Sequence, residues 1–314
     1  MAHRILGLHH VTATVGDAQQ DLDFCLDVLG LRLVKKTVNF DNHRVYHFYY
    51  GTERGLPGTI WTTFPYKERG TRVGSKGAGQ VVATAFSVPA ASLAFWRDRL
   101  TTHGAPVRSV EARLGEEAFQ TSDPSGLWFE LVGTDRDGRE PWCGNGVGRQ
   151  DAIRGLHSVT MIVKALGPTL AFMLDVLGYV MVGQEGSRTR VADGGDAPGH
   201  IIDIIEDPHA EPAVNGIGTV HHVAMAIATP DEQLRLRESL VHMGLEVTEV
   251  KDRCYFQSIY FREPGGVLLE VATVQPGFTV DEDLLSLGRN LKLPPWEEAH
   301  RAEIEAGLTA VNHF

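Results

Sequence analysis

One segment of this chain occurs twice, and this repetition constrains the fold more than any other feature. FCLDVLG spans residues 24–30, and FMLDVLG spans residues 172–178. The strand-like segments that precede them also correspond, LHHVTATV at 8–15 and LHSVTMIV at 156–163. Two weaker copies begin with VVATAFSV at 81–88 and VHHVAMAI at 220–227. Such self-similarity indicates a supersecondary unit that is repeated along the chain, and we number its four copies modules 1 to 4.

Each module has the pattern of one strand, one helix and three further strands. In module 1 the apolar positions after the first strand fall on one helix face: Ala18, Leu22, Cys25, Leu26 and Leu29. Asp17 is placed to cap the start of this helix, and Gly30 follows its end. Glycines also mark the ends of the other three helices, at Gly104, Gly178 and Gly244. A glycine marks the turn before each last strand, at Gly58, Gly126, Gly199 and Gly266.

Four βαβββ modules predict an α+β fold with mixed sheets, because strands outnumber helices and do not alternate with them. We expect two tandem domains, 1–150 with modules 1 and 2 and 151–280 with modules 3 and 4. The segment DGREPWCGNGVGRQD, rich in glycine and charge, reads as the linker. Residues 281–314 form a tail with an expected helix.

Composition and charge exclude several classes of protein. The net charge of −11 argues against nucleic acid or an anionic membrane surface as a partner. No apolar run is long enough to span a bilayer, and the N-terminus lacks the features of a signal peptide. The three cysteines are far apart and form no CxxC motif, so we expect no disulfide framework and a cytoplasmic location.

The repeat allows equivalent positions of the four modules to be compared. One position in the first strand holds His10, Ala83, Ser158 and His222. One position in the last strand, four residues after the turn glycine, holds Thr62, Glu130, Asp203 and Glu270. Modules 1 and 4 together thus offer two imidazoles and one carboxylate. Two histidines and one carboxylate with open positions are typical of non-haem Fe(II) sites that react with O2. We therefore predict that His10, His222 and Glu270 bind a metal.

The histidine doublets and the remaining acids need separate interpretations. Adjacent strand residues point to opposite faces, so we expect only the second histidine of each doublet to bind metal. His9 and His221 share their position with His157, which lies in a module without a metal histidine; a structural and a pocket role both stay open for them. Because no imidazoles accompany Glu130 and Asp203, we expect these acids to form salt bridges or to be solvated at a sheet edge, and not to form a second metal site.

The βαβββ repeat with first-strand histidines resembles the vicinal oxygen chelate superfamily, which includes glyoxalase I, bleomycin-resistance proteins and extradiol dioxygenases. A closer likeness runs nearly end to end. It is carried by LHHVT, KKTVNFD, GTERGLPGTIWTTFP, RCYFQSIYFREPGGVLLEVAT and the tail GFTVDEDLLSLGRNLKL. These segments resemble the hydroquinone ring-cleaving dioxygenases, a group that includes 2,6-dichlorohydroquinone 1,2-dioxygenase.

The resemblance implies an Fe(II) enzyme that opens hydroquinone-like rings with O2, with Mn(II) as an acceptable alternative metal. It implies His10, His222 and Glu270 as the ligands and Tyr260 and Arg253 as catalytic and substrate-binding residues. A tyrosine hydroxyl can relay a proton, and an arginine can stabilise phenolate charge. Thr12 is expected to line the same pocket. His9 and His221 are further candidates for catalytic residues. We also expect the protein to form a homo-oligomer.

Two other functions remain open at this stage. A glyoxalase-type isomerase or lyase would use the same fold with a divalent metal, but it would need a fourth protein ligand where this chain has Thr62. A non-catalytic binding protein of the bleomycin-resistance kind would have no use for the three ligands. Tight nickel or zinc binding without O2 uptake would support the isomerase.

Overall fold

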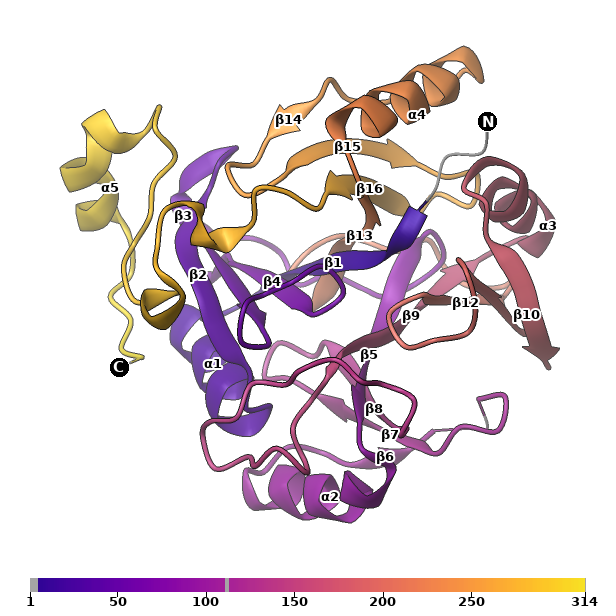
Figure 1. The fold of residues 1–314 in the computed structure, drawn as a ribbon, viewed down its shortest axis with the longest axis horizontal. Helices are drawn as coiled ribbons and strands as arrows, with labels where there is room; N and C mark the ends of the chain where they lie inside the picture. The colour runs from indigo at the N-terminus through magenta and orange to yellow at the C-terminus, as the bar shows by residue number, and fades with distance from the viewer. Residues whose placement is uncertain (1–4, 111–112, 314) are drawn as a thin grey trace.

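The computed structural model describes residues 5–110 and 113–313, and the four βαβββ modules are confirmed (Figure 1). Module 1 consists of β1 (Ile5–Val15), α1 (Ala18–Asp23), β2 (Arg32–Asn39), β3 (Asn42–Gly51) and β4 (Ile60–Pro65). Module 2 consists of β5 (Gln80–Val88), α2 (Leu93–Thr102), β6 (Arg108–Ser109), β7 (Ala118–Ser122) and β8 (Trp128–Gly133).

Module 3 consists of β9 (Gly155–Val163), α3 (Leu166–Ala171), β10 (Val180–Glu185), β11 (Arg188–Ala192) and β12 (Ile201–Glu206). Module 4 consists of β13 (Thr219–Ile227), α4 (Pro230–His242), β14 (Lys251–Asp252), β15 (Gln257–Arg262) and β16 (Leu268–Thr273). The repeated heptapeptide has a shared conformation, because α1 and α3 both continue as a π-helical turn, at Phe24–Val28 and Phe172–Val176.

The strands form two eight-stranded sheets, and each sheet joins modules from both halves of the chain. The first has the order β14-β15-β16-β13-β1-β4-β3-β2, and the second has the order β10-β11-β12-β9-β5-β8-β7-β6. Modules 1 and 4 therefore share one sheet, and modules 2 and 3 share the other. That 1–150 and 151–280 form separate domains stays a prediction. The sheet pairing has a direct consequence for the site, because β1 and β13, which carry the histidine doublets, are antiparallel neighbours.

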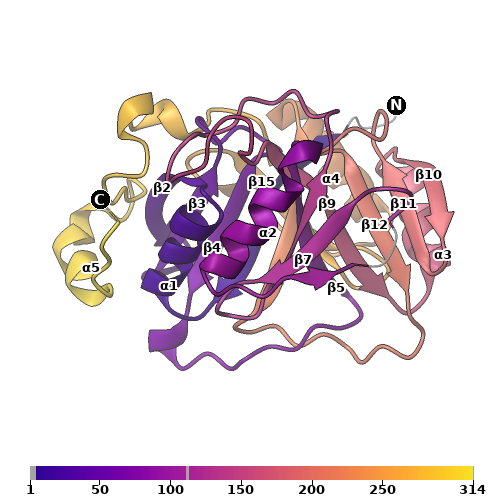
Figure 2. The ribbon, with the colours of Figure 1, turned by 90° about the horizontal axis from the view of Figure 1, so that it is seen from below.

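The expected helix boundaries are present. The Asp17 carboxylate accepts hydrogen bonds from the backbone N–H groups of Gln19 and Gln20, at 2.9 and 3.1 Å. The residues after the four helices adopt the left-handed conformation that glycine tolerates, at Gly30, Gly104, Gly178 and Gly244. Helices α1 and α2 lie on one side of the molecule (Figure 2).

A buried polar cluster lies beneath α1. Asp21 Oδ2 accepts hydrogen bonds from Tyr50 Oη at 2.7 Å and from Thr63 Oγ1 at 2.5 Å. Burial raises the pKa of Asp21 to about 7, although these hydroxyl donors oppose the shift. This carboxyl group is therefore partly protonated near neutral pH.

The tail closes the outer edge of the first sheet. Leu291 forms a bridge with Lys36 of β2, and the buried Lys35 contacts Asp281 and Glu282 of the tail. The tail ends in α5 (Arg301–Gly307), which lies beside the same edge (Figures 1 and 2). Within the described residues, the helices are all too short or too polar to cross a bilayer.

Candidate metal centre

The sheet pairing brings the three predicted ligands together. β1 lies antiparallel to β13, and β13 runs parallel to β16, so His10, His222 and Glu270 lie on three adjacent strands. Glu270 Oε2 lies 3.2 Å from His10 Nε2 and 2.8 Å from His222 Nε2, and the two Nε2 atoms are 3.4 Å apart. All three side chains are buried. One ligand atom from each side chain lies within 4.8 Å of the other two, so the three together could hold a metal ion.

The donor set fits a divalent metal. Glu270 Oε2 is buried and has no hydrogen bond of good geometry, although both imidazoles face it. Its other oxygen, Oε1, accepts a short hydrogen bond from Ser258, which fixes the carboxylate plane. Burial would raise the pKa of Glu270, but the two imidazoles outweigh burial and hold it well below its usual range. Two imidazole nitrogens and a carboxylate oxygen suit iron or manganese.

The first histidine of each doublet contacts the second. His9 Nδ1 lies 2.8 Å from His10 Nδ1, and His221 Nδ1 lies 2.8 Å from His222 Nδ1. Burial, reinforced by the neighbouring histidine, lowers the pKa of both His9 and His221 to about 3, so both rings are neutral. A histidine that binds metal through Nε2 keeps its proton on Nδ1 and donates it to a neighbour. His9 and His221 are placed to accept those two protons.

The expectation that His9 and His221 face away from the ligands is wrong, and the reason is a β-bulge. Leu8 and His10 pair with the consecutive residues Met225 and Ala224, so His9 is the extra residue on β1. The same pairing makes His221 the extra residue on β13. A bulge breaks the strict alternation of side chains and redirects one of them, which allows both members of a doublet to meet.

The bulge belongs to the repeat itself. In the second sheet the extra residues are Val82 on β5 and His157 on β9, at the positions equivalent to His9 and His221. His157 Nδ1 lies 3.1 Å from Ser158 Oγ, so it contacts the next side chain just as the other two histidines do. The contact between neighbours is therefore present in a module without a metal histidine.

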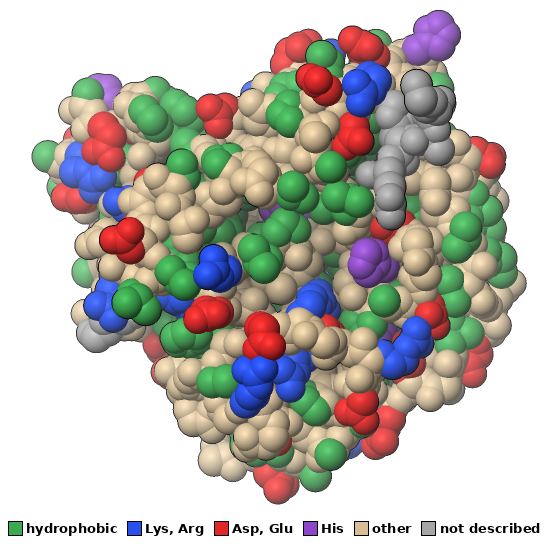
Figure 3. All heavy atoms as spheres, in the orientation of Figure 1, with side chains coloured by type: hydrophobic (Ala, Val, Ile, Leu, Met, Phe, Trp, Pro, Cys, Tyr) green, Lys and Arg blue, Asp and Glu red, His purple; other side chains and the backbone are tan. Residues whose placement is uncertain are grey.

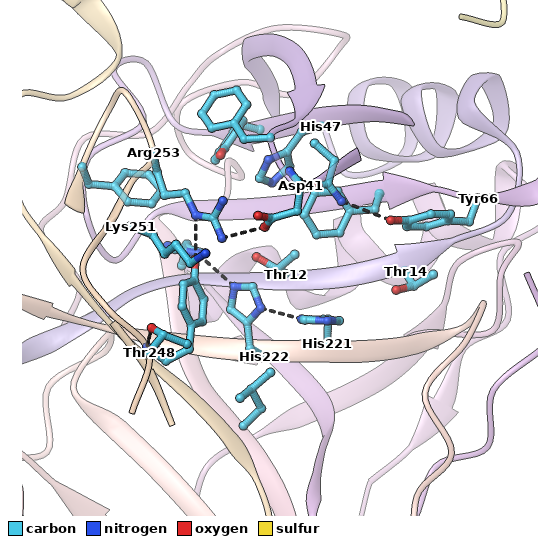
Figure 4. Close-up of a pocket in the computed structure, with 18 residues that line it drawn as sticks. Thr12, Thr14, Asp41, His47, Tyr66, His221, His222, Thr248, Lys251 and Arg253 are labelled. Atoms are coloured by element: carbon cyan, nitrogen blue, oxygen red, sulfur yellow. Dashed lines mark hydrogen bonds and ion pairs between the residues drawn. The ribbon is translucent and has the colours of Figure 1, made fainter. Parts of the chain in front are cut away.

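A cavity of about 490 Å³ is lined by two of the predicted ligands, His10 and His222, and Figure 4 shows its lining residues. Its lining includes four of the residues expected there, Thr12, His221, Arg253 and Tyr260, whereas His9 is buried behind His10 against Phe256. Arg253 Nε donates a hydrogen bond to Tyr260 Oη at 3.1 Å. Burial raises the pKa of Tyr260 and the Glu270 charge adds to this, so the hydroxyl keeps its proton.

Sequence reasoning missed several lining residues, of which His47 on β3 is the most informative. His47 Nε2 lies 2.9 Å from Thr62 Oγ1, and Thr62 Oγ1 donates to Thr12 Oγ1 at 2.8 Å. Thr62 thus fills the fourth last-strand position with a hydrogen-bonded hydroxyl. His47 occupies no repeated position, so the comparison of modules could not find it. Asn39 and Asp41 lie within the segment KKTVNFD, which had signalled only the family resemblance.

The equivalent place in the second sheet holds an arginine. Arg113, fully buried, forms a short ion pair with Glu130 and contacts Asp203 Oδ2 at 3.1 Å and Ser158 Oγ at 2.8 Å. Arg190 adds a second guanidinium, 2.8 Å from Asp203 Oδ1. Glu130 and Asp203 are therefore in buried salt bridges, the first of the two roles expected from the sequence, and not solvated at a sheet edge.

The tandem βαβββ modules and the two-histidine, one-carboxylate centre define a class of protein, and comparison with known families identifies it. The chain belongs to the Glyoxalase/Bleomycin resistance protein/Dioxygenase superfamily, whose model matches residues 7–131 and 155–271. Maize glyoxalase I shares this fold at 13% identity, with a TM-score of 0.62 over 86% of this chain and 92% of that one.

Within this superfamily the chain is similar to ring-cleaving dioxygenases. The Bacillus subtilis protein named "Putative ring-cleaving dioxygenase MhqO" is 41% identical over 98% of this chain and 97% of its own length. The chlorohydroquinone/hydroquinone 1,2-dioxygenase of Sphingobium indicum is 37% identical over 97% and 96%. A crystal structure of a Bacillus subtilis homologue has a TM-score of 0.95 and 40% identity, covering 100% of this chain and 99% of that one.

Proposed function

We propose that this protein is an Fe(II)-dependent dioxygenase that uses O2 to cleave the ring of hydroquinone-like aromatics, with Mn(II) as the alternative metal. The observation that carries the proposal is the convergence of three buried ligand atoms, from His10, His222 and Glu270, beside a cavity of about 490 Å³. The similarity to a hydroquinone 1,2-dioxygenase over almost the whole chain supports the substrate class.

The residues around the ligands have distinct tasks. When bound, the metal supplies the activation of O2 toward an aromatic ring. A hydroquinone has its two hydroxyl groups on opposite sides of the ring, so it can reach the metal through one oxygen only. Protein groups must therefore orient the ring. Arg253 can stabilise phenolate charge, Tyr260 keeps a proton to donate, and Thr12 presents a hydroxyl from the metal side of the cavity.

His9 and His221 support the ligands in this proposal. Each accepts the Nδ1 proton of its neighbour, which leaves Nε2 of His10 and His222 free to bind metal. His221 also lines the cavity, so it can in addition contact the substrate. His9 lies behind the ligands and acts only through His10.

Two structural details weigh against the other functions. Thr62 occupies the place of a fourth ligand, and its hydroxyl is engaged by Thr12 and His47, which disfavours a glyoxalase-type centre. A pure binding protein would not need an oriented ligand set. All three cysteines are free, which suits the proposed cytoplasmic location; assembly into a homo-oligomer stays a prediction.

Loading with Fe(II) under anaerobic conditions, followed by O2-electrode assays on a panel of hydroquinones and catechols, tests the proposal. We expect the protein to bind one iron ion per chain and to consume O2 when a hydroquinone is added. Glu270→Gln should lower iron affinity at least about tenfold, since it removes the carboxylate ligand. Glu130→Gln is the matched control at the equivalent position and should leave iron binding unchanged. Absence of O2 uptake with every compound, or unchanged iron binding in Glu270→Gln, would refute the proposal.

A further inference from the structure

The turn between β2 and β3, formed by Phe40 and Asp41, lines the cavity from module 1 together with Asn39, the last residue of β2. It is anchored on two sides besides the cavity. Asn39 Nδ2 donates to Tyr66 Oη at 3.1 Å, and the Phe40 ring packs edge-to-face on Trp296 of the tail, with 5.7 Å between ring centroids. Asn39 Oδ1 also accepts the Asp41 backbone N–H at 2.9 Å. The position of Asp41 is therefore well defined although its side chain is exposed.

Asp41 reaches across the cavity to module 4. One terminal nitrogen of Arg253 donates to Asp41 Oδ2 at 2.9 Å, while Arg253 Nε donates to Tyr260 Oη at 3.1 Å (Figure 4). The guanidinium is thus held at two separate edges, by Asp41 of module 1 and by Tyr260 of module 4. These contacts use two of its five N–H groups.

The backbone alone does not fix where this guanidinium points. Arg253 sits in a tight turn in which its N–H donates to Phe256 O at 2.9 Å and its carbonyl accepts from Tyr255 N–H at 2.7 Å. The turn sets the position of its Cα. An arginine side chain has four rotatable bonds beyond that point, and its preferred direction depends on the groups that it contacts. In this structure the negatively charged contact is Asp41.

We propose that Asp41 is a positioning residue, which holds the Arg253 guanidinium beside Tyr260 so that its remaining N–H groups receive the phenolate oxygen of the substrate. The inference rests on the proposed function and adds a residue from module 1 to substrate recognition. Because the Asp41 side chain is 62% exposed, water screens the pair, and its contribution is modest. An effect of about fivefold on substrate affinity corresponds to about 1 kcal/mol.

Steady-state kinetics with hydroquinone test this role. Asp41→Asn should raise KM about fivefold and change kcat less, because the contact acts on bound substrate and transition state alike. Asp41→Glu should restore most of the loss. In an Arg253→Ala background, Asp41→Asn should have no further effect, because its partner is gone. Glu246→Gln, which removes one exposed charge elsewhere in module 4, is the control and should behave as wild type.

The outcomes separate this inference from the proposed function. An unchanged KM in Asp41→Asn, or an equal rise of KM in the Arg253→Ala background, overturns the role of Asp41 while the enzyme remains a dioxygenase. If the wild type consumes no O2 with any hydroquinone, the proposed function fails, and phenol binding to the Mn(II)-loaded protein, measured by calorimetry, tests Asp41 instead. Equal phenol affinity of wild type and Asp41→Asn, or no phenol binding to either, then overturns the inference.

Discussion

Replacing His9 by leucine should weaken metal binding without touching a ligand. His9 is buried, and its Nδ1 lies 2.8 Å from His10 Nδ1. Leucine has a similar volume but offers no acceptor, so the His10 Nδ1 proton would be left unpaired in the interior, at a cost of about 1–3 kcal/mol. Loss of the partner of a metal-binding histidine typically lowers metal affinity about 10- to 100-fold, and we expect His9→Leu to fall in that range.

Mn(II) titration calorimetry on the metal-free protein measures this effect directly. Manganese avoids the oxidation that complicates iron and accepts the same ligands. The dissociation constant should rise about 10- to 100-fold in His9→Leu, while equimolar binding is retained because the three ligands remain. Circular dichroism and the unfolding midpoint should confirm that the variant is folded.

The repeat provides a matched control for this experiment. His157 occupies the equivalent bulge position on β9, and its Nδ1 contacts Ser158 rather than a ligand. His157→Leu should therefore leave the Mn(II) dissociation constant within about twofold of wild type. A His9→Leu variant that binds Mn(II) as wild type does, or an equal loss in His157→Leu, would refute a role of the doublet in orienting the ligand.

Further predictions concern stability. Arg113→Met should cost about 3–5 kcal/mol of unfolding free energy in urea, because it removes the cation that pairs with the buried Glu130, while Asp203 keeps Arg188 and Arg190. Arg149→Gln, which removes an exposed pair, should cost about 1 kcal/mol or less. Asp21 has a pKa raised from 3.8 to about 7, so its folded form holds a proton that the unfolded chain releases. The shift therefore contributes up to about 4 kcal/mol to the free energy of unfolding. This contribution is complete below about pH 4 and is lost as the pH rises to about 7. Asp21→Asn should flatten the pH dependence of the urea-unfolding free energy in that window; an unaltered profile would contradict this origin.

The local pattern of the chain was sufficient to predict the modules and to propose three ligands that the fold brings together. Helix caps such as Asp17 and turn glycines such as Gly30 act within a few residues, so they can be read without knowledge of the fold. The candidate ligands could be singled out because the repeat aligns His10 and His222 with Ala83 and Ser158. A residue that breaks the repeat in this way stands out even in a single sequence.

The features that were missed depend on contacts between distant segments. The contact of His9 with His10 arises from the register of β1 against β13, and a register cannot be read from the alternation within one strand. Asp41 enters the site from a turn whose place is fixed by Tyr66 and Trp296. Arg113 comes from a connection between strands, where no equivalent residue marks it as important.

The two sheets differ in the side chains that face their buried last-strand acids. In the second sheet the last-strand acids, Glu130 and Asp203, both pair with the guanidinium of Arg113. Asp203 also pairs with two further arginines, Arg188 and Arg190. In the first sheet, among the described residues, the ion pairs of Glu270 are with His10 and His222 alone. A buried carboxylate requires a positive partner, and the metal that we propose at His10, His222 and Glu270 would supply it. The same repeat thus places an arginine at the centre of one sheet and the proposed ligands of a metal at the centre of the other.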